Sequence, residues 1–191
     1  IHMNWKCNFE YYADGRIKKN TDCSNEDFIL SIDSDESRLS VTVFPKRKIE
    51  FRKFELTADY QVNSDERIFT NGYQSWTVSR EYSPNEAMDE FNPRFLGVKK
   101  SKFNPLGIWG AGDLLWHDYP EKQGLFYGYS YAYVRKGNAL TLFGSLSERA
   151  GYTVFTFDTN KNTLTIAKDL EGVSIKKKKR VLDAVIIRGE Y

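Results

Sequence analysis

Apolar and polar residues alternate in short runs along most of this chain, and a period of two residues is typical of half-buried β-strands. In the N-terminal half the runs are 5–12, 27–32, 39–44 and 49–62. In the C-terminal half they are 125–134, 139–146, 152–158, 163–168 and 181–187. Turn-forming residues separate neighbouring runs, as at Asp14-Gly15, Lys136-Gly137-Asn138 and 158–162. The pattern therefore predicts strands that follow one another through turns.

Within the run 49–62 the apolar positions change parity between Phe51 and Phe54. One extra residue in a strand produces such a change, so we expect a β-bulge or a bend there. No segment has the pattern of a helix, and the chain has no internal repeat or low-complexity linker. We therefore expect an all-β fold, an antiparallel β-sandwich with few or no helices. A length of 191 residues fits one domain, which we place at residues 4–191.

Residues 83–124 interrupt the alternation. Three Asn/Pro pairings, Pro84-Asn85, Asn92-Pro93 and Asn104-Pro105, are followed by glycines at 107, 110 and 112. This composition predicts a long and mostly irregular excursion, and long ordered loops are usually functional.

The composition is that of an ordinary soluble globular protein with many aromatic residues. Hydrophobic residues make up 40%, charged residues 28% and aromatic residues 15%, and the aromatic excess favours strands. The 28 basic and 26 acidic side chains leave a net charge of +2, which creates no long-range attraction for nucleic acid or an anionic membrane. The basic run 176–180 allows a nucleic-acid patch, but a solvated turn or strand edge is the favoured interpretation.

The cysteines and the start of the chain add little about its compartment. Cys7 and Cys23 are the only cysteines, too few for a disulfide framework. A single bridge is allowed by their spacing but not indicated by it, so free thiols are the default expectation. No apolar run reaches membrane-spanning length. We interpret residues 1–3 as a remnant of cloning, and we expect a cytoplasmic protein, with a secreted or periplasmic protein that has lost a signal peptide as the alternative.

The sequence lacks the residue combinations that most kinds of catalytic site require. His117 is the only histidine outside residues 1–3, so neither a zinc site nor a Ser-His-Asp triad is expected, and no cofactor is predicted. Glycosidases need two carboxylates at a suitable separation. Asp113, Asp118 and Glu121 share the long excursion with Trp116 and His117. Any of these could touch a sugar, but the sequence nominates none of them as a nucleophile.

The segment Asn71-Gly-Tyr-Gln-Ser-Trp-Thr77 combines a turn signal, a large aromatic ring and several amide or hydroxyl groups. An exposed indole covers the C–H face of a hexose, while amides and hydroxyls bond to its rim. The segment thus predicts a carbohydrate contact centred on Trp76. The alternative is that Trp76 anchors the core of the sandwich.

Several motifs in order resemble the N-terminal β-sandwich domain of α-galactosidases from family 36 of the glycoside hydrolases. They are Asn71-Gly-Tyr-Gln-Ser-Trp76, Gly124-Leu-Phe-Tyr-Gly128, Phe143-Gly-Ser-Leu146 and Lys168-Asp-Leu-Glu-Gly172. The resemblance covers most of residues 5–191, and its specific part is the first motif. It implies a β-supersandwich of the galactose-mutarotase-like type, packed on a downstream (β/α)₈ barrel that supplies two catalytic aspartates. The barrel's Lys-x-Asp nucleophile motif does not occur in this chain.

The resemblance also implies roles for individual residues. Trp76 matches the tryptophan that reaches from the sandwich into the galactose pocket of the barrel. Asn71 and Gln74, with Gly72 and Ser75, would shape the turn that presents it, and Tyr73 would support it. These residues form the predicted substrate site, to which Asp113, Trp116 and His117 are weaker additions.

The leading hypothesis is therefore a non-catalytic N-terminal domain of an α-galactosidase-like hydrolase, inactive as a fragment. Its expected partners are an α-galactoside or galactose, the downstream barrel and, at an interface, further copies of the same chain; no nucleic-acid or membrane partner is expected. The alternatives are a free-standing carbohydrate-binding module and a purely structural or interaction domain.

Overall fold

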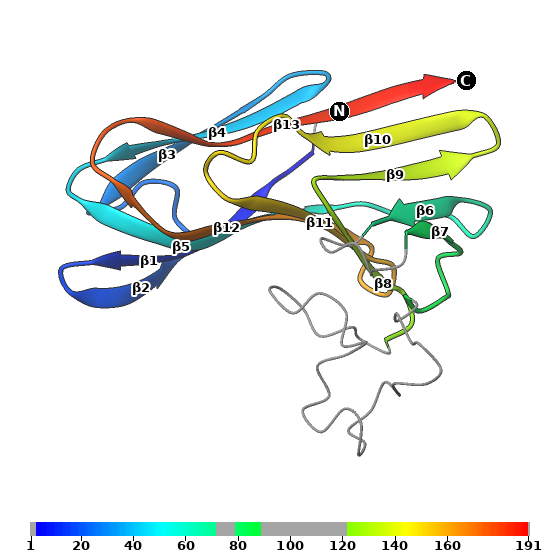
Figure 1. Cartoon of the computed structure of the whole chain (residues 1–191), viewed down its shortest axis with the longest axis horizontal. Coiled ribbons are helices and arrows are strands. Elements are labelled where there is room, and N and C mark those ends of the chain that lie inside the picture. Colours follow the sequence, from blue (N-terminus) through cyan, green and yellow to red (C-terminus); the bar gives the residue numbers. More distant parts are fainter. Residues whose placement is uncertain (1–2, 72–78, 89–121, 191) are drawn as a thin grey trace, which may run out of the picture.

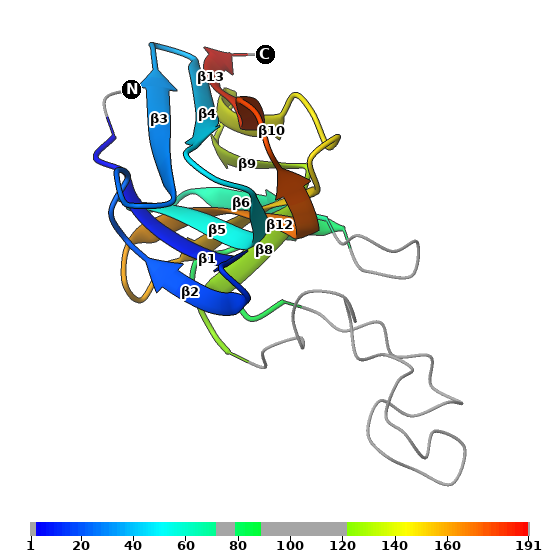
Figure 2. The same ribbon diagram turned by 90° about the vertical axis from the view of Figure 1, so that its left-hand side faces the viewer.

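The computed structural model describes residues 3–71, 79–88 and 122–190, and within these ranges it contains thirteen strands and no helix. The strands form two antiparallel sheets that pack face to face, which confirms the predicted all-β sandwich. In Figure 2, strands β3, β4, β13, β10 and β9 lie above β1, β2, β5 and β8.

The six-stranded sheet has the order β2 (Arg16–Asn20), β1 (Lys6–Ala13), β5 (Ile49–Asp59), β12 (Thr163–Ile175), β11 (Tyr152–Asp158), β8 (Leu125–Tyr129). The seven-stranded sheet has the order β3 (Phe28–Ser34), β4 (Arg38–Pro45), β13 (Lys179–Glu190), β10 (Ala139–Ser145), β9 (Tyr131–Lys136), β6 (Arg67–Thr70), β7 (Arg80–Tyr82). Figure 1 shows β13, β10 and β9 running side by side.

The core between the sheets is rich in aromatic rings. Phe28 of β3 packs edge-on against Phe9 and Tyr11 of β1, with ring centroids 5.4 Å and 5.0 Å away. At the other end, Phe143 contacts Phe157 across the layers at 5.3 Å. Each of these side chains is almost completely buried. Edge-to-face pairs stabilise a core beyond the area that they bury, so the aromatic excess of the sequence serves the packing of the two sheets.

The predicted irregularity between Phe51 and Phe54 is a β-bulge. Along β1, consecutive residues Glu10 and Tyr11 pair with Lys53 and Phe51 of β5, so Arg52 is the extra residue. Phe51 and Phe54 are both fully buried, whereas Arg52 is exposed. The bulge thus restores the inward face after the change of parity.

Other predicted elements are confirmed or corrected. The turn 158–162 joins β11 to β12, and Lys176, Lys177 and Lys178 form an exposed turn before β13. The expected strand 125–134 is wrong as one element, because Ser130 has a positive φ of 65° and separates β8 from β9. Strand β12 continues to Ile175, beyond the expected end at Lys168. The short strands β2, β6 and β7 were not predicted.

A buried carboxylate holds the start of β3. Asp27 is fully buried, and its Oδ2 accepts hydrogen bonds from Tyr11 Oη and Lys18 Nζ, both at 2.8 Å. Arg47 Nε lies 3.2 Å from Oδ1. Desolvation raises the pKa of Asp27, but the hydrogen bonds from Lys18 and Tyr11 outweigh it and leave this pKa below its usual value. Asp27 therefore stays ionised in the folded protein.

We expect Asp27→Asn to lower the free energy of unfolding by about 3 kcal/mol at pH 7, because it leaves Lys18 and Arg47 without their shared anion. The ordinary carboxyl pKa is 3.8 and the folded-state pKa is lower. The stabilisation from Asp27 is thus complete above about pH 3.8 and is lost as the pH falls through the folded-state pKa. Urea titrations across this pH range measure both effects.

Glu26→Gln is the matched control, because Glu26 also accepts a hydrogen bond from Lys18 but its side chain is 68% exposed. Exposed pairs contribute little, so this variant should keep nearly all of its stability. Equal losses in the two variants would contradict the assigned role of Asp27.

Candidate functional site

The predicted sugar-binding motif is the connection between β6 and β7. Thr70 and Arg80 are register partners in this strand pair, so the connection 71–79 starts and ends at neighbouring points of the sheet. The structure describes Asn71 at its start. Tyr73, Gln74 and Trp76 lie outside the described residues, as do Asp113, Trp116 and His117. Their roles therefore stay predictions.

The start of this connection is fixed by four residues that we call the loop root: Thr70, Asn71, Gly128 and Tyr129. Thr70 is fully buried at the end of β6. The Asn71 carbonyl oxygen accepts the backbone N–H of Tyr129 at 3.2 Å. Because β6 and β8 belong to different sheets, this hydrogen bond joins the two layers at the point where the motif begins.

Gly128 allows the close approach at the loop root. A Cβ added there would lie 2.9 Å from the Tyr131 carbonyl oxygen and 3.3 Å from Asn71 Oδ1. Any larger residue would displace the backbone or the Asn71 side chain. Two motifs that are far apart in the sequence, Asn71–Trp76 and Gly124–Gly128, thus meet at their described residues.

Two buried oxygens at the loop root, Thr70 Oγ1 and Asn71 Oδ1, have no hydrogen-bond partner among the described residues. Both oxygens lie directly before residues 72–78, which are outside the described residues. The loop root is therefore the described part of the fold that lies nearest to the predicted motif.

The other two motifs of the resemblance, 143–146 and 168–172, contact each other through Thr153 near the loop root. Lys168 Nζ is fully buried and donates to Thr153 Oγ1 at 2.7 Å, and Thr153 Oγ1 donates to Ser145 Oγ at 3.1 Å. The Ser130 N–H donates to the Thr153 carbonyl oxygen at 2.9 Å, which connects this group to the end of β8. Burial lowers the pKa of Lys168, because desolvation disfavours its charged form. These contacts hold strands in place, and they offer no exposed reactive group.

An aromatic strip lies on the outer face of the seven-stranded sheet next to the loop root. It consists of Phe69, Tyr131 and Tyr133. The Phe69 ring is nearly parallel to Tyr133, at 4.8 Å and 7°, and to Tyr131, at 5.8 Å and 19°. Tyr131 is 43% exposed. Aromatic rings beside polar groups are the usual contacts for sugars, so the strip is a second candidate surface.

Polar contacts fix the strip from β7 and β9. Tyr133 Oη donates to Glu81 Oε1 at 2.8 Å, and Arg135 Nε donates to the same oxygen at 2.7 Å. Arg135 Nη2 donates to the second oxygen of Glu81. The hydrogen bond from Arg135 lowers the pKa of Glu81, so the carboxylate is ionised and positions the tyrosine hydroxyl.

The ends of the long excursion are held together at the turn after β11. Thr159 Oγ1 donates to the carbonyl oxygens of Pro84 and Gly124 at 2.7 Å and 3.1 Å. The Gly124 N–H donates to the Glu86 carbonyl oxygen at 2.8 Å. The described ends of the predicted excursion therefore lie at one place, and residues 89–121 are outside the described residues.

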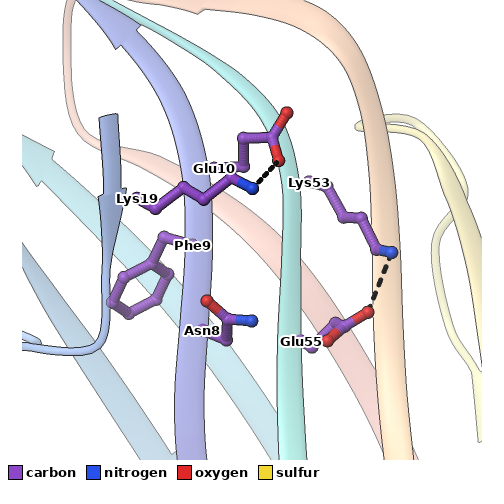
Figure 3. A pocket seen from close by; sticks show the side chains of 6 residues that line it. All are labelled: Asn8, Phe9, Glu10, Lys19, Lys53 and Glu55. Carbon is purple, nitrogen blue, oxygen red and sulfur yellow. Dashed lines mark ion pairs between the residues drawn. The ribbon is translucent and has the colours of Figure 1, made fainter. Parts of the chain in front are cut away.

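A separate hollow of about 230 Å³ lies on the outer face of the six-stranded sheet, among Asn8, Glu10, Lys19, Lys53 and Glu55. Figure 3 shows Lys19 directed at Glu10 and Lys53 directed at Glu55. These ion pairs have N–O distances of 3.8 Å and 2.9 Å. The charges neutralise one another, and no predicted site residue lines this hollow.

The described ranges contain no group of three or more His, Cys, Asp or Glu side chains able to hold a metal ion. In the same ranges, no helix has the length and apolar character needed to cross a membrane. No protein-family model and no curated protein matches this chain.

The sequence interpretation missed the strip and the contact between Asn71 and Gly128. The strip had a signal in the sequence, because Ala132 and Val134 alternate with Tyr131, Tyr133 and Arg135. In a strand with one buried face, small apolar residues at alternate positions place the tyrosines outward. The meeting of Asn71 with Gly128 had no local signal, because it depends on how the two sheets stack.

We expect Gly128→Ala to lower the free energy of unfolding by about 2 kcal/mol through overpacking at the loop root. It should also speed hydrogen exchange of the Tyr129 amide, whose acceptor Asn71 would be displaced. Gly144→Ala is the control, because its Cβ would meet Val185 at an ordinary 3.5 Å. If Tyr129 exchanges equally fast in both variants, Gly128 does not hold Asn71 in position.

Proposed function

We propose that this chain is the non-catalytic N-terminal β-sandwich domain of an α-galactosidase-like glycoside hydrolase. In this proposal Trp76 packs on a terminal α-galactosyl residue in a pocket completed by a downstream (β/α)₈ barrel. The barrel supplies the catalytic aspartates, and the sandwich supplies one wall of the pocket. The proposal rests on the motif resemblance, and the fold is compatible with it.

The observation that supports it most is the anchoring of the motif. Asn71 begins a connection whose two ends are strand partners, and its carbonyl oxygen is tied to β8 of the opposite sheet. A loop that presents a tryptophan to a sugar must be held within a fraction of an ångström to be useful. The loop root provides that support through the backbone hydrogen bond between Tyr129 and Asn71 and through the close packing at Gly128.

A second candidate is a free-standing carbohydrate-binding module, and the aromatic strip favours it. Tyr131 is exposed, and Tyr133 is positioned by Glu81 beside it. Such a module would bind sugar on the outer face of β6 and β9 without a second domain. The two candidates therefore differ in which aromatic residue contacts the sugar.

For the isolated chain we expect no turnover of an aryl α-galactoside and a galactose Kd of about 1 mM or weaker. The isolated chain would supply only one wall of the sugar pocket, and it would lack the catalytic aspartates of the barrel. Weak binding and the absence of turnover are therefore both expected. Calorimetric titration of Trp76→Ala and Tyr131→Ala tests which residue contacts the sugar. Any weak binding should disappear in the Trp76 variant and persist in the Tyr131 variant. Turnover by the isolated chain would overturn the proposal, and tight binding lost only with Tyr131→Ala would establish the binding module.

The source gene provides the complementary test. We expect the reading frame to continue past the codon for Tyr191 into a barrel with a Lys-x-Asp motif. In that longer protein, Trp76→Ala should raise KM for an aryl α-galactoside at least about tenfold, since a buried sugar–indole contact contributes on the order of 1.5 kcal/mol. A stop codon at that point would contradict the proposal and favour the binding module.

A further inference from the structure

The two cysteines lie close together at one edge of the sandwich. This edge, formed by β1, β2 and β3, is opposite to the edge that contains β6, β7 and β8. Cys7 on β1 and Cys23 in the connection 21–27 are 16 positions apart, and their Sγ atoms are 3.5 Å from each other. Cys7 is 8% exposed and Cys23 is half-buried. Both are free thiols in this structure. This pairing was not indicated by the sequence spacing.

The connection that carries Cys23 runs from one sheet to the other. It leaves β2 of the six-stranded sheet and enters β3 at the edge of the seven-stranded sheet. The Cys23 carbonyl oxygen accepts the N–H of Leu30 at 2.7 Å, which fixes its backbone against β3. Cys7 lies on β1, which is paired on both sides by β2 and β5. A covalent link between the thiols would therefore join the two layers.

A disulfide needs the two sulfur atoms at about 2.05 Å. From 3.5 Å, they must approach by about 1.5 Å, a shift that rotation about the Cα–Cβ bonds and a small movement of the connection can supply. Cys23 lies outside the named strands, and only the Cys23 carbonyl and the isolated bridge Ser24–Ile29 tie this part of the connection to β3. The two sulfur atoms are thus within reach of each other after a small adjustment.

We propose that Cys7 and Cys23 form a modification site whose co-reactant is a small-molecule disulfide, and that its product is an intramolecular disulfide joining the two sheets. Cys23 is the first thiol to react, because it is the more exposed of the two. Burial raises the pKa of Cys7 to about 12, so Cys7 is protonated at neutral pH and is a poor first nucleophile.

The reaction consists of two exchanges. Cys23 loses its proton to solvent, its thiolate attacks one sulfur of the small disulfide and forms a mixed disulfide, and the first small thiolate leaves and takes up a proton. Cys7 then loses its proton and attacks Cys23 Sγ, and the second small thiolate leaves and takes up a proton. The protein dithiol is oxidised by two electrons, and the small disulfide is reduced to two thiols. Atoms, charges and electrons balance with no other reactant.

The test uses the whole chain in buffers of oxidised and reduced glutathione, followed by acid quenching, alkylation and mass spectrometry. The expected product is monomeric, has lost two hydrogens, resists alkylation and yields one peptide pair linking Cys7 to Cys23. The ratio of the oxidised glutathione concentration to the square of the reduced glutathione concentration at which half of the chain is oxidised should be at least about tenfold lower for the folded chain than for the chain in urea. The reason is that the native geometry holds the two thiols together. The midpoint of thermal unfolding should rise by about 5 °C.

Cys7→Ala is the informative variant, because it should stop at the mixed disulfide on Cys23 and show no rise in the unfolding midpoint. A stable glutathione adduct on the unmodified sequence, or disulfide-linked dimers, would overturn the proposal. Equal oxidation equilibria with and without urea would do so as well. These measurements on the unmodified sequence decide the question even if a cysteine variant fails to fold.

Discussion

The fold depends on keeping Phe51 and Phe54 on the same face of β5. This strand lies between β1 and β12 in the six-stranded sheet, and both phenylalanines are fully buried. They are three positions apart along the chain, so a regular strand would expose one of them. Arg52 absorbs the mismatch as a bulge against β1. On the other side, β12 shifts its register between Asp169 and Val173 and buries Leu170 completely. Position 151, which faces the start of this irregular segment, requires glycine. A Cβ there would lie only 1.8 Å from the Asp169 carbonyl oxygen.

The same region explains why Lys168 is buried. Its ammonium group lies under the segment between β10 and β11 and donates to the Ser147 carbonyl oxygen at 2.8 Å as well as to Thr153. Removing an ammonium group from water is costly unless its donors are satisfied. Here the contacts hold this segment and, through Thr153 and Ser130, the end of β8 that binds Asn71. The packing of the core and the loop root are thus parts of one continuous set of contacts.

Alternation of apolar residues was enough to predict the sandwich, because most strands have one buried face. It failed where a strand buries little. Strand β2, with the sequence Arg-Ile-Lys-Lys-Asn, has only Ile17 as an apolar residue, and Ile17 is 45% exposed. Strands β6 and β7 are four and three residues long, too short for a period to be recognised. The segment that carries the candidate site was predictable from the sequence, but the contacts of Asn71 with β8 that hold its start were not. Asn71 meets Gly128, and Cys7 meets Cys23, only through the stacking of two sheets, which local spacing does not encode.

The geometry of the aromatic strip bears on the choice between the two functional proposals. A module that binds sugar unaided needs ring faces that are open to the ligand. Phe69 lies parallel to Tyr133 at a centroid distance of 4.8 Å, so these two rings cover part of each other's faces. Tyr131 keeps the largest exposed surface of the three, and one exposed ring gives weak attraction. The loop root has the opposite character, because Thr70, Gly128 and Tyr129 are buried and a backbone hydrogen bond ties Asn71 to Tyr129. The strip is thus a weak platform for a sugar by itself, and the loop root supports the start of the predicted motif without offering a binding surface of its own.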